Sequence, residues 1–235
     1  LTSGSPDQVA ERLTRLVEPY AEIDARRDTW MPGGFLAPEE STLEEDQELL
    51  ASDRCQELIN WWLARPRGAT RPNWDIAATA MVGGQKGIVL VEAKALHAEL
   101  SDAGKSPWDN PSNADRIRAA ICQANAGLGG AQAGWKLTTD SHYQLCNRFA
   151  WSWKIASFGV PVILVYLGFL NTEEMSDIGQ PFRSAIEWSN VIRGHAEGIV
   201  PNDAWDRPID VNGTKMRAII QAVDPYNESH YVPRN

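Results

Sequence analysis

Cysteine is scarce in this sequence. Three cysteines occur in 235 residues, at Cys55, Cys122 and Cys146. Their odd number and wide spacing exclude a disulfide framework and a zinc-knuckle pattern. We expect reduced, mostly buried thiols.

Paired histidines and long apolar runs are also absent. The four histidines contain no i, i+4 pair that could hold a metal on one helix face, which disfavours a zinc hydrolase. A membrane span needs about 18 apolar residues, and the longest candidate run here, Val160–Leu170, is much shorter. Residues 1–6 lack the basic and apolar regions of a secretory signal. We therefore expect a cytoplasmic protein with no membrane partner.

Positive charge is in deficit, but only in one part of the chain. The net charge is −9, and residues 1–64 carry 14 acidic and 5 basic side chains, which already gives −9. The remaining residues carry 17 of each sign and balance to zero, so a local basic rim for phosphate is not excluded. We expect an acidic N-terminal helical region at residues 1–40 and an α/β domain at residues 41–235.

Helical periodicity is present in several segments. Apolar spacing and start or stop signals predict helices at residues 5–26, about 41–64, about 114–126 and 141–157, and a further helix that starts near Pro181. Gly127 is expected to end the third of these helices.

Between these segments lie runs that are typical of strands. Residues 74–95 alternate with period two around Gly83–Gly87 and predict an antiparallel hairpin, and Asn212-Gly213 predicts a second hairpin. Val162–Leu167 is apolar on both faces, as in a strand covered by helices on each side. The pattern predicts an α/β fold with a mixed central β-sheet flanked by helices.

The first hairpin carries charges in an apolar strand. Glu92 and Lys94 lie two residues apart and therefore point to the same face. Burying such groups costs several kcal/mol unless each has a partner, so their presence suggests a function. Asp75 begins the preceding strand, and pairing across the turn sets it opposite the Glu92 region.

Converging carboxylates suit a hard cation. Asp75 and Glu92 would supply oxygen ligands to Mg²⁺ or Mn²⁺, and the Ala93 carbonyl could add a third. Lys94 could polarise the attacking water and offset charge on a scissile phosphate. Phosphodiester hydrolysis is the reaction that this set favours.

An Asp on one strand followed by Glu-x-Lys on the next resembles the PD-(D/E)XK nuclease superfamily. Pro72-Asn73-Trp74-Asp75 corresponds to the "PD", with two residues inserted, and Glu92-Ala93-Lys94 to the "EXK". About 0.8 such triplets are expected by chance in this composition. The resemblance therefore depends on Asp75 in the preceding strand and on the apolar strand that contains the triplet. The resemblance implies a restriction-endonuclease-like fold, a divalent metal and DNA as substrate.

The same resemblance implies further site residues. In the exonuclease branch a following helix often carries Gln-x-x-x-Tyr. Gln144 matches the glutamine, and Arg148 replaces the tyrosine. These two residues stack on one helix face and could address water and phosphate. Many members also place a glutamate on the helix before the aspartate strand, where Glu57 is our choice. Glu45 and Glu48 are the other candidates for that position.

Two alternatives stay open at this stage. The chain could be a nuclease-fold protein without activity that binds nucleic acid or a protein partner. It could also be an unrelated α/β domain with a chance triplet, which predicts that Asp75 and Glu92 lie on opposite faces or more than about 8 Å apart. The sequence leaves open whether cleavage is endo or exo and whether a homodimer cuts both strands.

Overall fold

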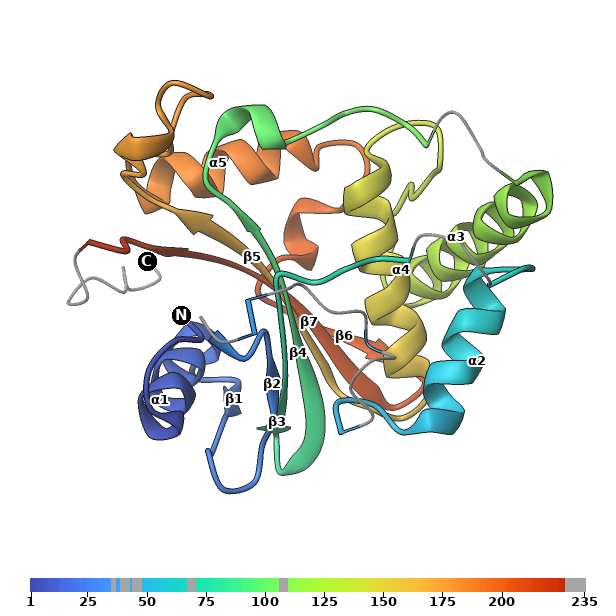
Figure 1. The fold of residues 1–235 in the computed structure, drawn as a ribbon. Helices are drawn as coiled ribbons and strands as arrows, with labels where there is room; N and C mark the ends of the chain where they lie inside the picture. The colour runs from blue at the N-terminus through green and yellow to red at the C-terminus, as the bar shows by residue number, and fades with distance from the viewer. Residues whose placement is uncertain (35–36, 39–42, 44–47, 67–70, 106–109, 227–235) are drawn as a thin grey trace.

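A mixed, curled β-sheet forms the centre of the computed structural model, which describes residues 1–34, 37–38, 43, 48–66, 71–105 and 110–226 (Figure 1). The strand order is β1-β3-β4-β5-β7-β6, with β2 also paired to β3. The strands are β1 (Ala21–Glu22), β2 (Trp30–Met31), β3 (Ile76–Val82), β4 (Gln85–Lys94), β5 (Val162–Phe169), β6 (Pro208–Val211) and β7 (Thr214–Val223).

The β3–β4 hairpin is confirmed, with a tighter turn than the sequence suggested. Val82 pairs with Gln85, so only Gly83 and Gly84 form the loop. Their φ angles are 57° and 85°, and a two-residue turn with positive φ at both positions matches the right-handed twist of the strands. Strand β4 then continues parallel to β5, and β5 parallel to β7, before β6 closes the far edge in the antiparallel direction.

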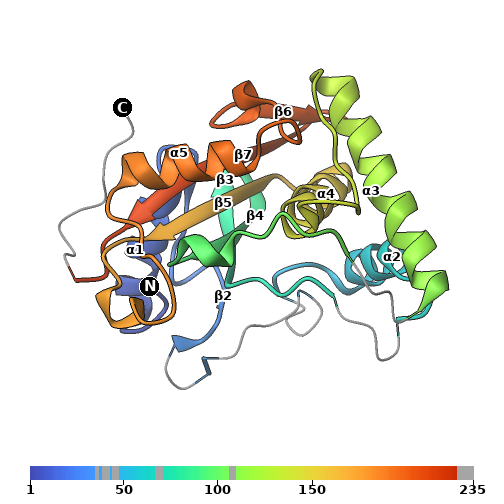
Figure 2. The same cartoon turned by 90° about the horizontal axis from the view of Figure 1, so that it is seen from above.

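Helices cover both faces of the sheet, which explains why β4 and β5 are apolar on both sides (Figure 2). Helix α1 (Pro6–Val17) packs on one face through Leu13 and Leu16 against alternate residues such as Val89 and Val165. The other face meets α2 (Ser52–Trp62), α3 (Pro111–Ala131), α4 (Tyr143–Ser157) and α5 (Ala185–His195). Because side chains alternate along a strand, Glu92 and Lys94 share this second face with Leu90.

The N-terminal helix is shorter than expected. It ends at Val17 rather than near residue 26, and the next residues enter the sheet. β1 and β2 both pair antiparallel with β3, at Ala21↔Val82 and Trp30↔Ala78. Tertiary pairing thus overrides the helical periodicity, and the N-terminal region is built into the same sheet as the rest of the chain.

Other helix boundaries also differ from the expectation, and α5 begins at Ala185 because Phe182 pairs with Leu170 in an isolated bridge. α2 begins at Ser52, since residues 48–51 are described as turn and loop, while most of residues 39–47 lies outside the described part. α3 does not stop at Gly127 and runs on to Ala131. A β-carbon on Gly127 would lie 2.4 Å from the Trp153 ring, so this glycine allows α3 and α4 to pack closely rather than ending the helix.

The second hairpin is also confirmed, with Asn212 and Gly213 at the turn between β6 and β7. Short 3₁₀ helices lie at His97–Glu99, Glu173–Met175 and Asn202–Ala204 among the described residues. In the parts of the chain that the structure describes, every helix is too short or too polar to cross a membrane.

Candidate functional site

The Asp75 carboxylate contacts the strand that carries Glu92. Asp75 occupies a bend directly before β3, and the pairing of β3 with β4 begins at Ile76 opposite Val91. Asp75 Oδ2 also accepts a 2.7 Å hydrogen bond from the Ala93 N–H. The Asp75 carboxylate is therefore bound to the residue next to Glu92.

Two cations hold the Glu92 carboxylate. Lys94 Nζ lies 2.5 Å from Oε1, and Arg148 Nε on α4 lies 2.5 Å from Oε2. All three side chains are buried, with Glu92 only 1% exposed. The Arg148 guanidinium also lies over the Trp74 ring, 4.6 Å from its centroid. Since a buried charge is costly without a partner, these residues form one ionic network in which each Glu92 oxygen faces a cation.

Tyr166 is a neighbour of this network that the sequence did not identify. It pairs with Glu92 in the parallel β4–β5 register. Burial, followed by the Glu92 charge, raises the pKa of Tyr166 well above its usual value. Its hydroxyl is buried and has no hydrogen-bond partner among the described residues. A neutral phenol therefore adjoins the ionic network.

The other expected site residues divide into two groups. Gln144 lies one turn before Arg148 on α4 and is half-buried, so it shares the helix face that approaches Glu92. Glu57 is exposed, and its carboxylate pairs with Lys154, at 3.1 Å, and with Arg54. Lys154 lies six residues beyond Arg148, about 9 Å farther along the helix axis, so the structure does not bring Glu57 to Glu92.

Of the two remaining glutamate candidates, the structure describes one. Glu48 is exposed in the turn before α2, and Glu45 lies outside the described residues. In α2, the ion pairs of Glu57 thus join it to Arg54 and Lys154 rather than to the cations at Glu92.

A second polar cluster joins three distant segments. His142 Nε2 and His195 Nδ1 each lie 3.0 Å from the same oxygen, Oδ1 of Asp102. His142 precedes α4, and His195 is the last residue of α5. Burial and the charge of His142 lower the pKa of His195, the Asp102 carboxylate opposes that shift, and Lys94 adds to it. The cluster thus gathers two imidazoles and a carboxylate from three distant segments.

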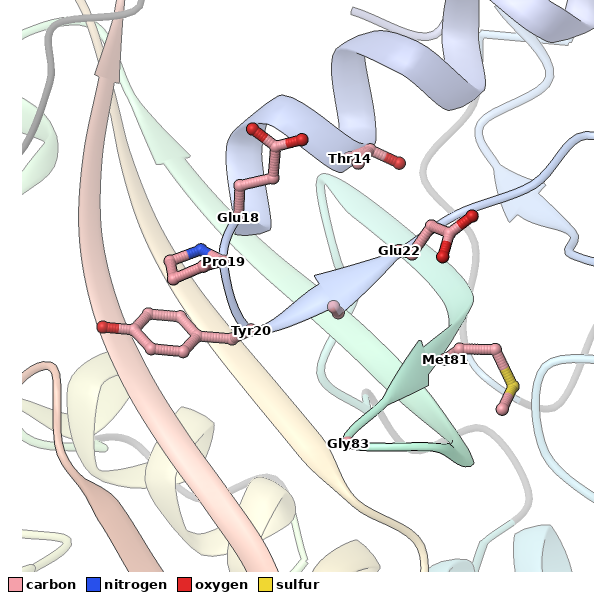
Figure 3. Close-up of a pocket in the computed structure, with 8 residues that line it drawn as sticks. Thr14, Glu18, Pro19, Tyr20, Glu22, Met81 and Gly83 are labelled. Carbon is pink, nitrogen blue, oxygen red and sulfur yellow. The ribbon is translucent and has the colours of Figure 1, made fainter.

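A shallow pocket lies elsewhere on the sheet (Figure 3). It has a volume of about 380 Å³ and is lined by Thr14, Glu18, Pro19, Tyr20, Ala21, Glu22, Met81 and Gly83. Met81 is six residues from Asp75, which is about 20 Å along an extended strand. The two glutamates make the pocket acidic, and none of the expected site residues lines it.

Similarity to known proteins adds no further information on the site. A scan of family models finds no match for the chain, and neither a curated protein nor a solved structure matches it. The geometry of the two clusters is therefore the basis of any functional proposal. Asp75 with Glu92 offers hard oxygen ligands, whereas Asp102 with two imidazoles offers a mixed oxygen and nitrogen set.

Proposed function

We propose that this chain is a divalent-metal-dependent nuclease with a restriction-endonuclease-like fold that hydrolyses phosphodiester bonds of DNA. The observation that carries the proposal is the contact of Asp75, at the bend before β3, with the Ala93 N–H next to Glu92, together with the contact of Lys94 with Glu92. Two carboxylates on neighbouring strands can serve one cation that has metal–oxygen bonds of about 2.1 Å.

The donor set fits Mg²⁺ or Mn²⁺. Asp75 and Glu92 supply hard anionic oxygens. The Ala93 N–H points toward Asp75, and the carbonyl of an extended residue points to the same side as its N–H, so a third oxygen is directed to the same edge. A bound divalent ion would supply Lewis acidity and orient the scissile phosphate.

The cations of the network suit the remaining tasks of the reaction. Each Glu92 oxygen is paired with Lys94 or Arg148, so metal binding requires one of these contacts to be exchanged. Lys94, once released, is placed to orient or deprotonate water and to offset charge on the phosphate. Arg148 can bind a phosphate oxygen in a charge-assisted hydrogen bond. Gln144, one turn earlier on α4, can position the water.

The same network favours a second candidate function. Two carboxylates and two cations cancel in formal charge, and a fully paired Glu92 is stable without a metal. A nuclease-fold protein that binds nucleic acid or a protein partner without cleaving it would have such a closed network. Cleavage and binding assays distinguish the two functions.

The test is cleavage of linear, circular and single-stranded DNA and of RNA in Mg²⁺ or Mn²⁺. Asp75→Asn and Lys94→Met should each lower the rate at least about 100-fold. Lys86→Met is the matched control, because Lys86 is exposed at the opposite end of β4 and should leave the rate unchanged. Thermal melts establish that each variant is folded.

Two results would count against the enzyme. Metal-dependent cleavage that survives both Asp75→Asn and Lys94→Met would remove these residues from the mechanism. Folded wild-type protein that retains a nucleic acid but cleaves none of the four substrates would favour the binding function.

A further inference from the structure

We infer that Asp102, His142 and His195 form a binding site for one divalent transition-metal ion of the zinc type, separate from the Asp75–Glu92 pair. One ligand atom from each of the three residues lies within 4.8 Å of the others. The inference does not depend on nuclease activity, because it uses a different set of residues.

The spacing of the donor atoms suits a small divalent ion. Both imidazole nitrogens lie 3.0 Å from Asp102 Oδ1. With metal–ligand bonds of about 2.0–2.2 Å in a tetrahedral site, neighbouring donors lie about 3.3–3.6 Å apart. The 3.0 Å contacts are hydrogen-bond lengths, and a shift of a few tenths of an ångström would accommodate an ion. The convergence of both rings on a single carboxylate oxygen is the feature that favours a shared ion.

The backbone holds two of the ligands in place before any ion binds. The His142 N–H donates to the Asp102 carbonyl at 2.9 Å, and the Tyr143 N–H donates to the Ala103 carbonyl at 3.1 Å. Ala103 also forms an antiparallel bridge with Ser141. The loop that carries Asp102 is thus fastened to the start of α4, and a fixed geometry of this kind lowers the entropic cost of binding.

His142 itself is held in an unfavourable conformation. Its φ of 48° lies in the left-handed region, which is uncommon for a residue other than glycine. Its Nδ1 is buried and has no hydrogen-bond partner in the described part of the chain. Local strain and an orphaned polar atom persist when the surrounding structure imposes them, and such positions concentrate at binding and active sites.

The exposure of the ligands matches an open site. The His195 side chain is 9% exposed, whereas that of Asp102 is 77% exposed. An ion bound here would have protein ligands on its inner side and water on its outer side. Three protein ligands and one open position are the arrangement of zinc sites that bind an exchangeable water or substrate group. Two imidazoles and a carboxylate favour Zn²⁺, Fe²⁺ or Ni²⁺ over Mg²⁺, which prefers oxygen ligands.

The experiment is isothermal titration of the chelator-treated full chain with Zn²⁺, together with visible absorption of the Co²⁺ form. A Cys122→Ser background removes the exposed thiol, which is itself a soft metal ligand. We expect one equivalent of tightly bound ion. Asp102→Asn, His142→Asn and His195→Gln should each weaken binding at least about 100-fold. Asparagine is chosen at position 142 because it tolerates positive φ.

Two controls separate this site from others in the chain. His97→Gln is the matched histidine control, since His97 also pairs with a carboxylate at 3.0 Å, that of Glu187, outside the cluster. Asp75→Asn tests whether the ion binds at the proposed nuclease site instead. Both variants should retain the affinity of the parent.

Three outcomes would overturn the inference. The first is the absence of stoichiometric Zn²⁺ binding by the folded parent protein. The second is undiminished binding after each replacement of Asp102, His142 and His195. The third is loss of Zn²⁺ binding in Asp75→Asn with retention in the variants of the cluster. Asp102→Asn keeps the side-chain shape at an exposed position, so a loss of binding in this variant cannot be ascribed to unfolding.

Discussion

Replacing Arg148 by methionine tests the ionic network around Glu92. The substitution removes the cation that lies 2.5 Å from Glu92 Oε2 and retains an unbranched side chain at this position of α4. It also removes the guanidinium that lies over the Trp74 ring. Lys94 stays at Oε1. The variant therefore leaves one buried carboxylate oxygen without its cation.

The expected loss of stability is large for one residue. Removing one partner of a buried ion pair costs about 3–5 kcal/mol. Because Lys94 still compensates the Glu92 charge, we expect the lower end, about 3 kcal/mol. In a chain of this size 1 kcal/mol shifts the melting temperature by about 2–4 °C. The melting temperature should therefore fall by about 6–12 °C.

An exposed ion pair of the same length provides the control. Lys215 and Asp210 also approach to 2.5 Å, but their side chains are 59% and 52% exposed. Solvent screening and side-chain entropy make such pairs weak. Lys215→Met should therefore leave the melting temperature unchanged within error. Calorimetry and urea titration of both variants, in the presence of a chelator, make the comparison.

A double-mutant cycle sharpens the test. If Arg148 acts through Glu92, the combined Glu92→Gln/Arg148→Met variant loses less stability than the sum of the two single variants, by about 0.5–3 kcal/mol. The reasoning is refuted if Arg148→Met melts like Lys215→Met. It is also refuted if the effects at Glu92 and Arg148 are strictly additive.

Two further predictions concern helix packing and thiol reactivity. Gly127→Ala should lower the free energy of unfolding by about 1–3 kcal/mol, because its β-carbon would meet the Trp153 ring at 2.4 Å. At Gly129 an added β-carbon would meet open space, so Gly129→Ala should raise the free energy of unfolding by about 0.5–1 kcal/mol. Urea denaturation compares the two variants, and similar effects of Gly127→Ala and Gly129→Ala would contradict this account of α3. In the native protein a thiol reagent should label exposed Cys122 quickly and Cys146 slowly, because burial raises the pKa of Cys146 to about 11 and keeps it as the unreactive thiol. Mass spectrometry checks this, and labelling of both at one rate would disprove it.

Two segments adopt a structure that differs from the one their local sequence predicts. The stretch around residues 5–26 has helical periodicity, yet its last third forms the loop and β1 because β3 offers an edge for pairing. Gly127 has the composition of a helix end, but it lies inside α3, where the Trp153 ring requires a residue without a side chain. In both cases the deciding contact comes from a segment distant in the sequence.

By itself the sequence determined the features that depend on near neighbours. A glycine turn within Gly83–Gly87, the apolar strand β5 and the shared face of Glu92 and Lys94 all follow from residue type and a period of two. Counting from the turn also brings Asp75, just before β3, to the end of β4 that carries Glu92, where Asp75 Oδ2 accepts the Ala93 N–H.

Only the tertiary structure decided which groups meet across long separations. Arg148 reaches Glu92 over 56 residues, and Asp102 meets His142 and His195 because the loop after β4, the start of α4 and the end of α5 converge. No spacing rule joins these segments, since their proximity results from helix packing on the sheet rather than from the backbone period. The sequence thus indicated Asp75, Glu92 and Lys94, and the fold brought Arg148 to Glu92 and assembled a second cluster with its own ligand chemistry.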